Sequence, residues 1–192
     1  AYEIALDGRK GPCWIDIPMN VQSENTIDGK EEKIEVINHE VIENKELSNQ
    51  IQTIVEGLKE AKRPLFWFGN GVRLSNAEDL LLPLIEKLNI PTILSWAGID
   101  MIDSNHALVY GRAGTYGQRC ANLILQNCDF LICVGTRLAI SQVGYDISEL
   151  ARDAKIAVVD IDPYEIEKYK EKYHYQIVTD AKVFLKNFDF QT

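Results

Sequence analysis

Five short apolar runs that alternate with helical segments constrain the fold of this chain more than any other feature. The runs cover residues 65–69, 91–95, 130–134, 155–161 and 175–178. Each ends in glycine or polar residues, which is typical of buried parallel strands. Strands and helices that alternate at this spacing indicate right-handed crossovers. The sequence therefore predicts an α/β fold, with a doubly wound parallel sheet of about six strands flanked by helices.

Sequence signals also indicate where helices begin. Ser75 and Glu78 have the spacing of a capping box and predict a helix over 76–88. Pro83 lies inside that segment and must kink or split it, because its ring blocks a helical hydrogen bond. Asp180 is expected to cap the last helix.

Glycine turns are concentrated between residues 110 and 146. Three glycines between residues 111 and 117 allow backbone conformations that other residues resist. Thr115 is the predicted N-cap of the next helix, and Gln118 follows at capping-box spacing. A glycine turn that opens a helix exposes N–H groups at a positive dipole end, where a phosphate can bind.

Polar and glycine residues follow each predicted strand, at the edge where parallel sheets bind ligands. They are Gly69, Asn70 and Gly71, then 95–98, then Gly135, Thr136 and Arg137, then 160–162, and finally 179–180. Because several strand ends agree, the sequence predicts a nucleotide site at this edge.

Several of these residues also have a purely structural interpretation. Arg137 could be a surface salt-bridge partner, and Asp160 and Asp162 could close a strand and cap a helix. The three tryptophans are expected in the core or at domain contacts. The carboxylates of Glu165, Glu167 and Glu171 are expected on a solvated helix face.

Composition excludes some classes of function. With 29 acidic and 20 basic residues, the net charge of −9 disfavours nucleic acid as a partner. No apolar run is long enough to span a membrane, and no signal peptide is predicted because residues 1–10 are a mixed polar segment. The four cysteines are interpreted as reduced core residues of a cytoplasmic protein. No metal-ligand cluster and no Ser/His/Asp set is present, so no catalytic or metal-binding residue is predicted.

The motifs resemble thiamine-diphosphate enzymes, and most closely the acetolactate synthase group. GRKGPCWIDIPMNVQ resembles the closing strand of their first, pyrimidine-binding domain. FWFGNGVRLS, IPTILSWAGID, GRAGTYGQRCAN, ICVGTRL and VVDIDPYEI resemble their central domain. The resemblance implies the end of a truncated first domain at 1–20, a linker at 21–44 and a central nucleotide-binding-type domain at 45–192.

The resemblance also implies that catalysis occurs elsewhere in a larger protein. The family's third domain holds thiamine diphosphate and Mg²⁺ with a Gly-Asp-Gly motif, which this sequence lacks. The parent enzyme would decarboxylate a 2-keto acid, transfer the two-carbon unit, and assemble as a homodimer or homotetramer with its first and third domains. This fragment alone would be inactive.

In the acetolactate synthase group the central domain binds FAD, whose role there is largely structural. The matching positions here are Gly69, Asn70, Gly71, Ile93, Leu94, Thr115, Tyr116, Gly117, Gly135, Thr136, Arg137, Asp160, Ile161, Asp180 and Ala181. Ala139 and Ser141 depart from the group, which has Asp and Arg there. FAD, another adenine nucleotide such as ADP, and an empty structural domain therefore all stay open.

Two further functions compete with the central-domain interpretation. A stand-alone adenine-nucleotide-binding module without catalysis would also fit the predicted site. An NAD-dependent enzyme on the same sheet topology would need a catalytic residue above the nicotinamide, and the sequence offers no candidate.

Overall fold

The computed structural model describes residues 1–25 and 45–191, with no side-chain description for 189–191. The chain divides into two compact units, Ala1–Glu43 and Asn44–Thr192. Most of the expected linker at 21–44 lies outside the described residues.

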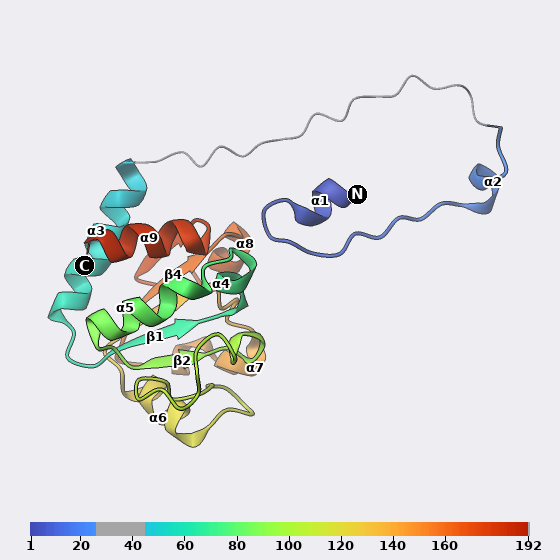
Figure 1. Ribbon diagram of the computed structural model, residues 1–192. Coiled ribbons are helices and arrows are strands. Elements are labelled where there is room, and N and C mark those ends of the chain that lie inside the picture. Colours follow the sequence, from blue (N-terminus) through green and yellow to red (C-terminus); the bar gives the residue numbers. More distant parts are fainter. Residues whose placement is uncertain (26–44, 192) are drawn as a thin grey trace. The chain divides into compact units, whose positions relative to one another are not determined.

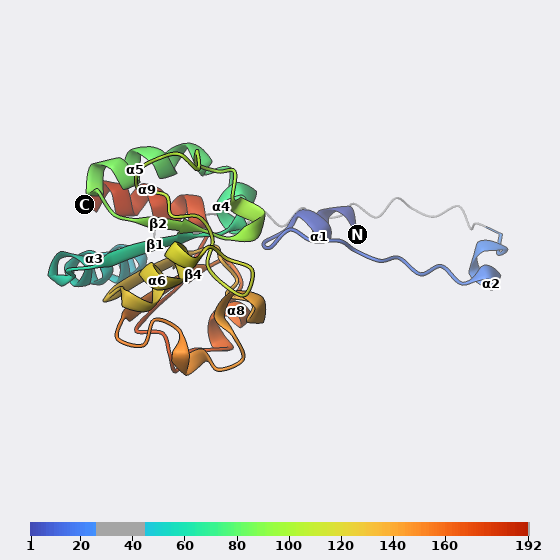
Figure 2. The same ribbon diagram turned by 90° about the horizontal axis from the view of Figure 1, so that it is seen from below.

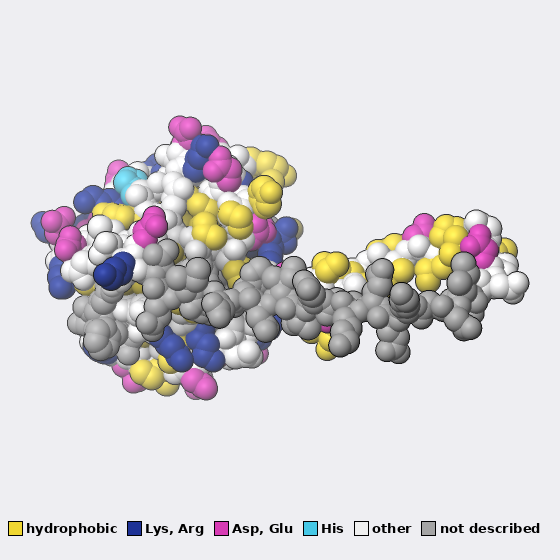
Figure 3. All heavy atoms as spheres, turned by 90° about the horizontal axis from the view of Figure 1, so that it is seen from above, with side chains coloured by type: hydrophobic (Ala, Val, Ile, Leu, Met, Phe, Trp, Pro, Cys, Tyr) yellow, Lys and Arg dark blue, Asp and Glu magenta, His cyan; other side chains and the backbone are white. Residues whose placement is uncertain are grey.

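The described part of the first unit has two short helices, α1 (Tyr2–Leu6) and α2 (Met19–Gln22), and neither buries a residue. The closing strand that the motif GRKGPCWIDIPMNVQ implied does not form in residues 8–22. A strand needs a neighbouring strand to satisfy its N–H and C=O groups, and the described part of this unit supplies none. Its apolar side chains face outward: Trp14 is 92% exposed, and Figure 3 shows hydrophobic side chains along this segment.

The second unit is built on a five-stranded sheet in which every pairing is parallel (Figure 1). The strands are β1 (Pro64–Phe68), β2 (Thr92–Leu94), β3 (Phe130–Val134), β4 (Lys155–Asp160) and β5 (Tyr175–Val178). Their order in the sheet is β2-β1-β3-β4-β5. The doubly wound parallel sheet is confirmed, with five strands in the described residues rather than about six.

Helices cover both faces of the sheet, which Figure 2 shows from below. The first face carries α3 (Lys45–Glu60), α4 (Asn70–Leu74), α5 (Leu81–Leu88) and α9 (Ala181–Gln191). The second face carries α6 (Arg119–Asn127), α7 (Ile140–Val143) and α8 (Pro163–Glu167). No helix in the described ranges is both long enough and apolar enough to cross a membrane.

Alternating side chains of the strands build two separate cores. Phe66 and Phe68 of β1 belong to the first core, and Leu65 and Trp67 of the same strand belong to the second. All four are at most 1% exposed. Burial on both faces explains why the strands are continuous apolar runs without polar alternation.

The helix predicted over 76–88 is split, as Pro83 required. A 3₁₀ turn occupies Glu78–Leu80, and α5 begins only at Leu81. Pro83 thereby lies in the first turn of α5, where a missing N–H costs nothing. The predicted capping box is wrong: Ser75 is the C-cap of α4, and its hydroxyl donates to the Val72 carbonyl at 2.8 Å.

Candidate functional site

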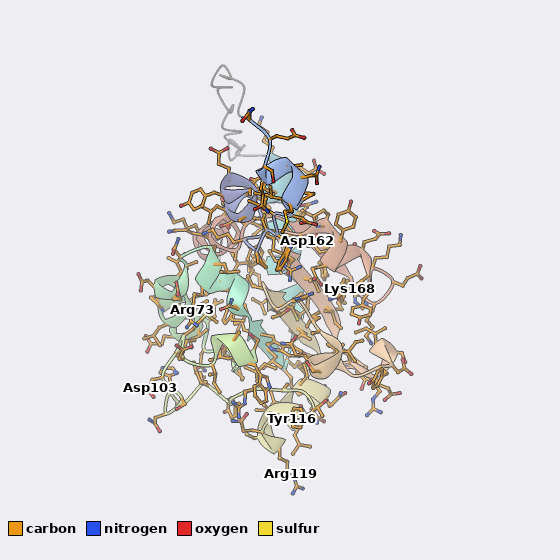
Figure 4. All side chains as sticks on the ribbon, turned by 90° about the vertical axis from the view of Figure 1, so that its right-hand side faces the viewer. Arg73, Asp103, Tyr116, Arg119, Asp162 and Lys168 are labelled. Carbon is orange, nitrogen blue, oxygen red and sulfur yellow. The ribbon has the colours of Figure 1, made fainter. Side chains whose placement is uncertain are left out.

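The strand order creates a switch point between β1 and β3. After β1 the chain forms β2, which pairs with one edge of β1. The next strand, β3, pairs with the opposite edge of β1. The loops beyond the carboxyl ends of two such strands diverge, and ligands of open α/β sheets bind between them. Figure 4 looks onto this edge, with Arg73 on its left, Lys168 on its right and Tyr116 below.

Backbone contact closes the two glycine loops at the switch point against each other. A Cβ on Gly69 would lie 2.2 Å from the Gly135 carbonyl oxygen, and a Cβ on Gly71 would lie 2.7 Å from the Gly135 Cα. The Gly69 N–H donates to the Val134 carbonyl, and the Gly71 N–H donates to the Gly135 carbonyl. These glycines permit close packing, and their N–H groups are already used within the protein.

The turn after β3 has a strained backbone. Gly135, Arg137 and Leu138 have φ values of +60°, +61° and +46°. For a non-glycine residue this conformation costs on the order of 1–2 kcal/mol. Two contacts offset the cost: Leu138 is buried in the second core, and Lys168 Nζ donates to the Arg137 carbonyl.

Thr136 faces inward from the same turn. It is 5% exposed, and its Oγ1 is enclosed beside the buried Cys133 thiol, with which it interacts. Its hydroxyl therefore points into the protein rather than toward a ligand at the edge.

Arg137 is held by a carboxylate from the next crossover. Its Nε lies 3.0 Å from Glu165 Oε1, while Glu165 Oε2 pairs with Lys168 Nζ. The Glu165 side chain is only 11% exposed, whereas that of Arg137 is 64% exposed. The solvated position expected for Glu165 is therefore wrong. The surface salt bridge considered for Arg137 is present, although its partner is largely buried.

The glycine loop before α6 has the backbone that the sequence indicated. Gly111 and Gly114 have φ values of +88° and +106°. The Leu94 N–H donates to the Gly111 carbonyl at 2.8 Å, and the Thr115 N–H donates to the Ser141 carbonyl at 3.0 Å. These bonds attach the loop to the end of β2 and to α7.

The predicted start of α6 is wrong. The N-cap is Gln118 rather than Thr115, and the helix begins at Arg119. Gln118 does not form a capping box, because its Oε1 accepts from the Arg112 N–H and its own N–H donates to the Arg112 carbonyl. Gln118 therefore closes the base of the loop, and the helix can start only after it.

An exposed aromatic pair lies beside this loop. The rings of Trp96 and Tyr116 meet edge to face with centroids 6.0 Å apart, and both residues are more than half exposed. The Arg112 guanidinium carbon lies 4.5 Å from the centroid of the Trp96 ring. Two solvent-facing aromatic rings and a guanidinium can receive a flat, electron-poor ring by stacking. Of the three tryptophans expected in the core or at domain contacts, only Trp67 is fully buried.

The strand-end residues of β2, β4 and β5 differ in what they can offer. Ile93 and Leu94 are 0% exposed and belong to opposite cores, so their side chains do not reach the edge. Ile161 is 37% exposed at the end of β4. Ala181 is 7% exposed at the start of α9.

The carboxylates at this edge have structural roles. Asp162 Oδ1 accepts from the Tyr164 N–H and caps α8, and Asp160 Oδ1 accepts from the Asp162 N–H. Asp180 Oδ1 accepts from the N–H of Lys182 and of Val183, which confirms the predicted cap of α9.

The cysteines provide no activated nucleophile. Burial raises the pKa of the Cys128 thiol to about 12 and the pKa of the Cys133 thiol well above its usual value, so both stay protonated. Cys13 and Cys120 are exposed, which corrects the expectation that all four lie in the core. Among the described residues, no group of three His, Cys, Asp or Glu side chains could hold a metal ion.

The structure brings most of the predicted edge together. Gly69 and Gly71 contact Gly135, and the Gly135 N–H donates to the Val159 carbonyl, next to Asp160. A pocket of about 420 Å³ lies at the opposite, amino-terminal edge. It is lined by Lys62, Arg63, Pro64, Asn89, Pro91, Tyr110, Ile124, Asn127 and Cys128, none of which was a predicted site residue.

The carboxyl edge fits only part of a flavin nucleotide. Trp96 and Tyr116 suit a flat ring. The side where a diphosphate would bind does not fit, because the glycine N–H groups are used and Arg137 is paired with Glu165. Sequence reasoning included Trp96 in the predicted edge at 95–98 without a stacking role and placed Glu165 on a solvated helix face, so it did not anticipate the pairing of Glu165 with Arg137. The position of Glu165 in the first turn after Asp162-Pro163 was the signal that could have identified it.

Comparison with known proteins finds one family model and several relatives that cover most of the chain. The profile of the family described as "Thiamine pyrophosphate enzyme, central domain" matches residues 51–188. The chain is 40% identical over 196 aligned positions to the "Probable acetolactate synthase large subunit" of Methanococcus aeolicus, a match that covers 97% of this chain and 31% of that protein. It is 34% identical over 178 positions to the "Acetolactate synthase isozyme 1 large subunit" of Escherichia coli (strain K12), with 90% and 30% covered. The chain spans about three tenths of the length of these relatives.

Proposed function

The chain belongs to the thiamine pyrophosphate enzyme central-domain family, and on that premise we propose that it is the central domain of a larger acetolactate synthase. The proposal is supported mainly by the agreement between the family match and the compact unit of the structure. The family match over 51–188 falls inside the compact unit Asn44–Thr192, and the named relatives are about three times longer than the chain. The remaining two thirds would supply the first and third domains.

In this proposal the parent enzyme decarboxylates a 2-keto acid and transfers the two-carbon unit. Thiamine diphosphate, held with Mg²⁺ by the other domains, supplies the electron sink for that chemistry. Residues 45–192 form the rigid body that joins those domains, and residues 1–20 are the end of the first domain. The exposed apolar residues of the first unit, among them Trp14 and Ile15, would pack against the rest of that domain.

The experiment that tests this proposal is an activity assay with and without the missing domains. The purified chain, given pyruvate, thiamine diphosphate and Mg²⁺, should form no acetolactate, whereas a full-length relative in the same assay should. Fusion of the chain in place of the matching segment of that relative should retain activity. Turnover by the chain alone would refute the proposed division of labour, and an inactive but folded fusion would refute the assignment as a central domain.

An adenine-nucleotide-binding role is the second candidate, whether in the parent enzyme or in a stand-alone module. The switch-point edge favours it, because ligands of open α/β sheets bind at such a point and the exposed pair of Trp96 and Tyr116 offers two aromatic rings there. Calorimetric titration with FAD, ADP and adenosine tests it directly. Micromolar binding of any of the three supports a nucleotide site, and heats at the level of buffer dilution for all three contradict it.

A double substitution tests where the diphosphate would lie. If FAD binds, Ala139→Asp with Ser141→Arg should tighten it about tenfold or more, because a charged pair at a phosphate strengthens binding. Ala139 is also the N-cap of α7, so Asp there would stabilise that helix as well. Affinity must therefore be measured separately from the melting temperature. Unchanged affinity would show that the diphosphate does not lie beside residues 139–141.

A further inference from the structure

Glu165 pairs with two cations at the carboxyl edge, Arg137 and Lys168. We propose that Glu165 determines the ligand specificity of this edge: it is a built-in substitute for a phosphate, and a diphosphate-bearing nucleotide binds only by displacing it from Arg137 and Lys168. The proposal rests on the nucleotide role proposed above and deepens it. Its prediction is that the edge favours ligands with a flat ring and little negative charge.

The geometry of the triad supports this assignment. One carboxylate oxygen of Glu165 is 3.0 Å from Arg137 Nε, and the other pairs with Lys168 Nζ. Both oxygens of one anionic group thus face separate cations, as two oxygens of a phosphate do. Lys168 also holds the Arg137 carbonyl, so the same three side chains fix the turn after β3.

Glu165 is held in this position by the start of α8. The N-cap Asp162 accepts from the Tyr164 N–H at 2.9 Å, and Pro163 fixes the first helical residue. Glu165 is the third helical residue, where the helix dipole also favours a negative charge. With 11% of its side chain exposed, Glu165 is shielded from the water that would otherwise screen the pair.

The other arginine beside the switch point is also paired. Arg73 of α4 lies 2.7 Å from Asp100 Oδ1 and 3.4 Å from Glu78 Oε1. Its Nη1 also donates to the Ala97 carbonyl at 3.0 Å. Arg73 and Arg137 are therefore both engaged by carboxylates of this chain.

The aromatic side of the edge is open by comparison. Trp96 and Tyr116 are 51% and 73% exposed, and the nearby Arg112 lies over the Trp96 ring rather than on a carboxylate. A nucleoside ring can stack there without displacing an ion pair. A diphosphate-bearing nucleotide must compete with Glu165 for Arg137 and Lys168, whereas an uncharged nucleoside need not. The edge should therefore bind the nucleoside more readily than its diphosphate.

The test compares Glu165→Gln with a matched control on the same helix. Glu165 pairs with Lys168, and Glu167 pairs with Lys170 at the same i,i+3 spacing, but the Glu167 side chain is 63% exposed. Glu167→Gln therefore removes the same charge without opening the edge. Calorimetric titration of the wild type and both variants with ADP and adenosine should show ADP binding tightened about tenfold or more in Glu165→Gln alone. Adenosine binding should not change in any of the three.

A double variant tests whether the tighter ADP binding of Glu165→Gln depends on Arg137. Adding Arg137→Gln to Glu165→Gln should return ADP affinity to within about threefold of the wild type, because the freed cation is then lost. If Glu165→Gln proves unstable, the wild type still supplies a test. On addition of ADP, the nuclear magnetic resonance signal of the Arg137 Nε–H should shift while Arg63 Nε–H, which donates to the Asn127 carbonyl at the other edge, does not.

The alternative outcomes separate this proposal from the nucleotide role. If ADP binds the wild type and Glu165→Gln with equal affinity, the role of Glu165 is refuted and the nucleotide role stands. The same conclusion follows if ADP affinity rises equally in Glu165→Gln and Glu167→Gln. If no variant binds ADP or adenosine, both fail. An unshifted Arg137 signal in wild type saturated with ADP would also refute the proposal.

Discussion

At the scale of single residues, a carboxylate often acts on backbone N–H groups rather than on another charge. Asp129, at the start of β3, accepts from the N–H of Lys62 at 2.9 Å and of Arg63 at 2.8 Å. Its own N–H donates to the Arg63 carbonyl at 3.1 Å. One side chain thus connects the turn before β1 to its neighbouring strand β3.

Asp129→Asn should destabilise the protein by about 1–2 kcal/mol at neutral pH, since bonds to a charged acceptor are stronger than bonds to an amide. Burial raises the pKa of Asp129, but the N–H groups of Arg63 and Lys62 outweigh it and lower the pKa overall. The stabilisation is therefore complete above the unfolded pKa of about 3.9 and is lost as pH falls through the lower folded pKa.

Urea unfolding between pH 2 and pH 7 measures this effect. The stability curves of the wild type and Asp129→Asn should be separate at pH 7 and converge at the acid end. Asp153→Asn, at an exposed position, is the control and should follow the wild type throughout. A constant gap at every pH would mean that the charge of Asp129 does not contribute.

At the scale of elements, the ends of β1 and β3 are joined by backbone packing that only glycine allows. The Gly69 N–H donates to the Val134 carbonyl at 2.9 Å, and the Gly71 N–H donates to the Gly135 carbonyl at 3.0 Å. The two loops therefore behave as one structural piece. Ligand binding at the switch point would depend on that piece remaining intact.

Gly69→Ala should cost about 3 kcal/mol or more, because the new Cβ would lie 2.2 Å from the Gly135 carbonyl oxygen and force the loops apart. Gly69 has a φ of −116°, so crowding alone causes the loss. Gly144→Ala is the matched contrast: its φ is +84° but its Cβ would meet nothing within 4 Å. Because its ψ is −179°, this backbone is one that essentially only glycine adopts, and Gly144→Ala should cost about 1–3 kcal/mol through conformation alone.

Thermal and urea unfolding of the two alanine variants provides the comparison. Gly69→Ala measures the cost of the loop contact at an ordinary φ, and Gly144→Ala measures the cost of backbone conformation where no contact forms. A Gly69→Ala variant as stable as the wild type would contradict the close packing of the two loops.

At the scale of the whole molecule, one sheet separates two cores that share the same strands. Trp67 and Phe68 are consecutive residues with 0% exposure, yet they belong to opposite cores. Loss of either core would leave one face of every strand without cover. The unit Asn44–Thr192 should therefore unfold as one cooperative body.

Phe184→Ala tests that cooperativity. Phe184 of α9 is fully buried in the first core, stacked on Phe188 with ring centroids 5.2 Å apart, and its truncation should cost about 3–5 kcal/mol. Trp67 reports from the second core, because it is the buried tryptophan of the three. Unfolding followed by tryptophan fluorescence and by far-ultraviolet circular dichroism should shift together.

Lys186→Ala, at an exposed position of the same helix, is the control and should leave both transitions unchanged. Two separate transitions in Phe184→Ala, with fluorescence retained after the helical signal is lost, would show that the second core survives alone. That result would contradict a single folding unit.

Local information in the sequence determined the sheet and most of its helices. The apolar run Phe130–Val134 had to be buried on both faces, and Pro83 had to interrupt its helix. The cap at Asp180 likewise depends on residues within three positions along the chain. Such features follow from short-range sterics and from the burial of apolar side chains, which one segment at a time can reveal.

Only the tertiary structure decided which side chains meet at the carboxyl edge. Glu165 and Glu167 are two residues apart in the sequence, but the fold turns the first toward Arg137 and the second toward solvent. The Gln118 side chain accepts from the Arg112 N–H instead of forming the predicted capping box. Trp14 and Trp96 are exposed rather than buried in a core. These outcomes depend on contacts between crossovers far apart in sequence, because the free energy of a partly buried ion pair or a closed loop depends on which groups the sheet order brings together.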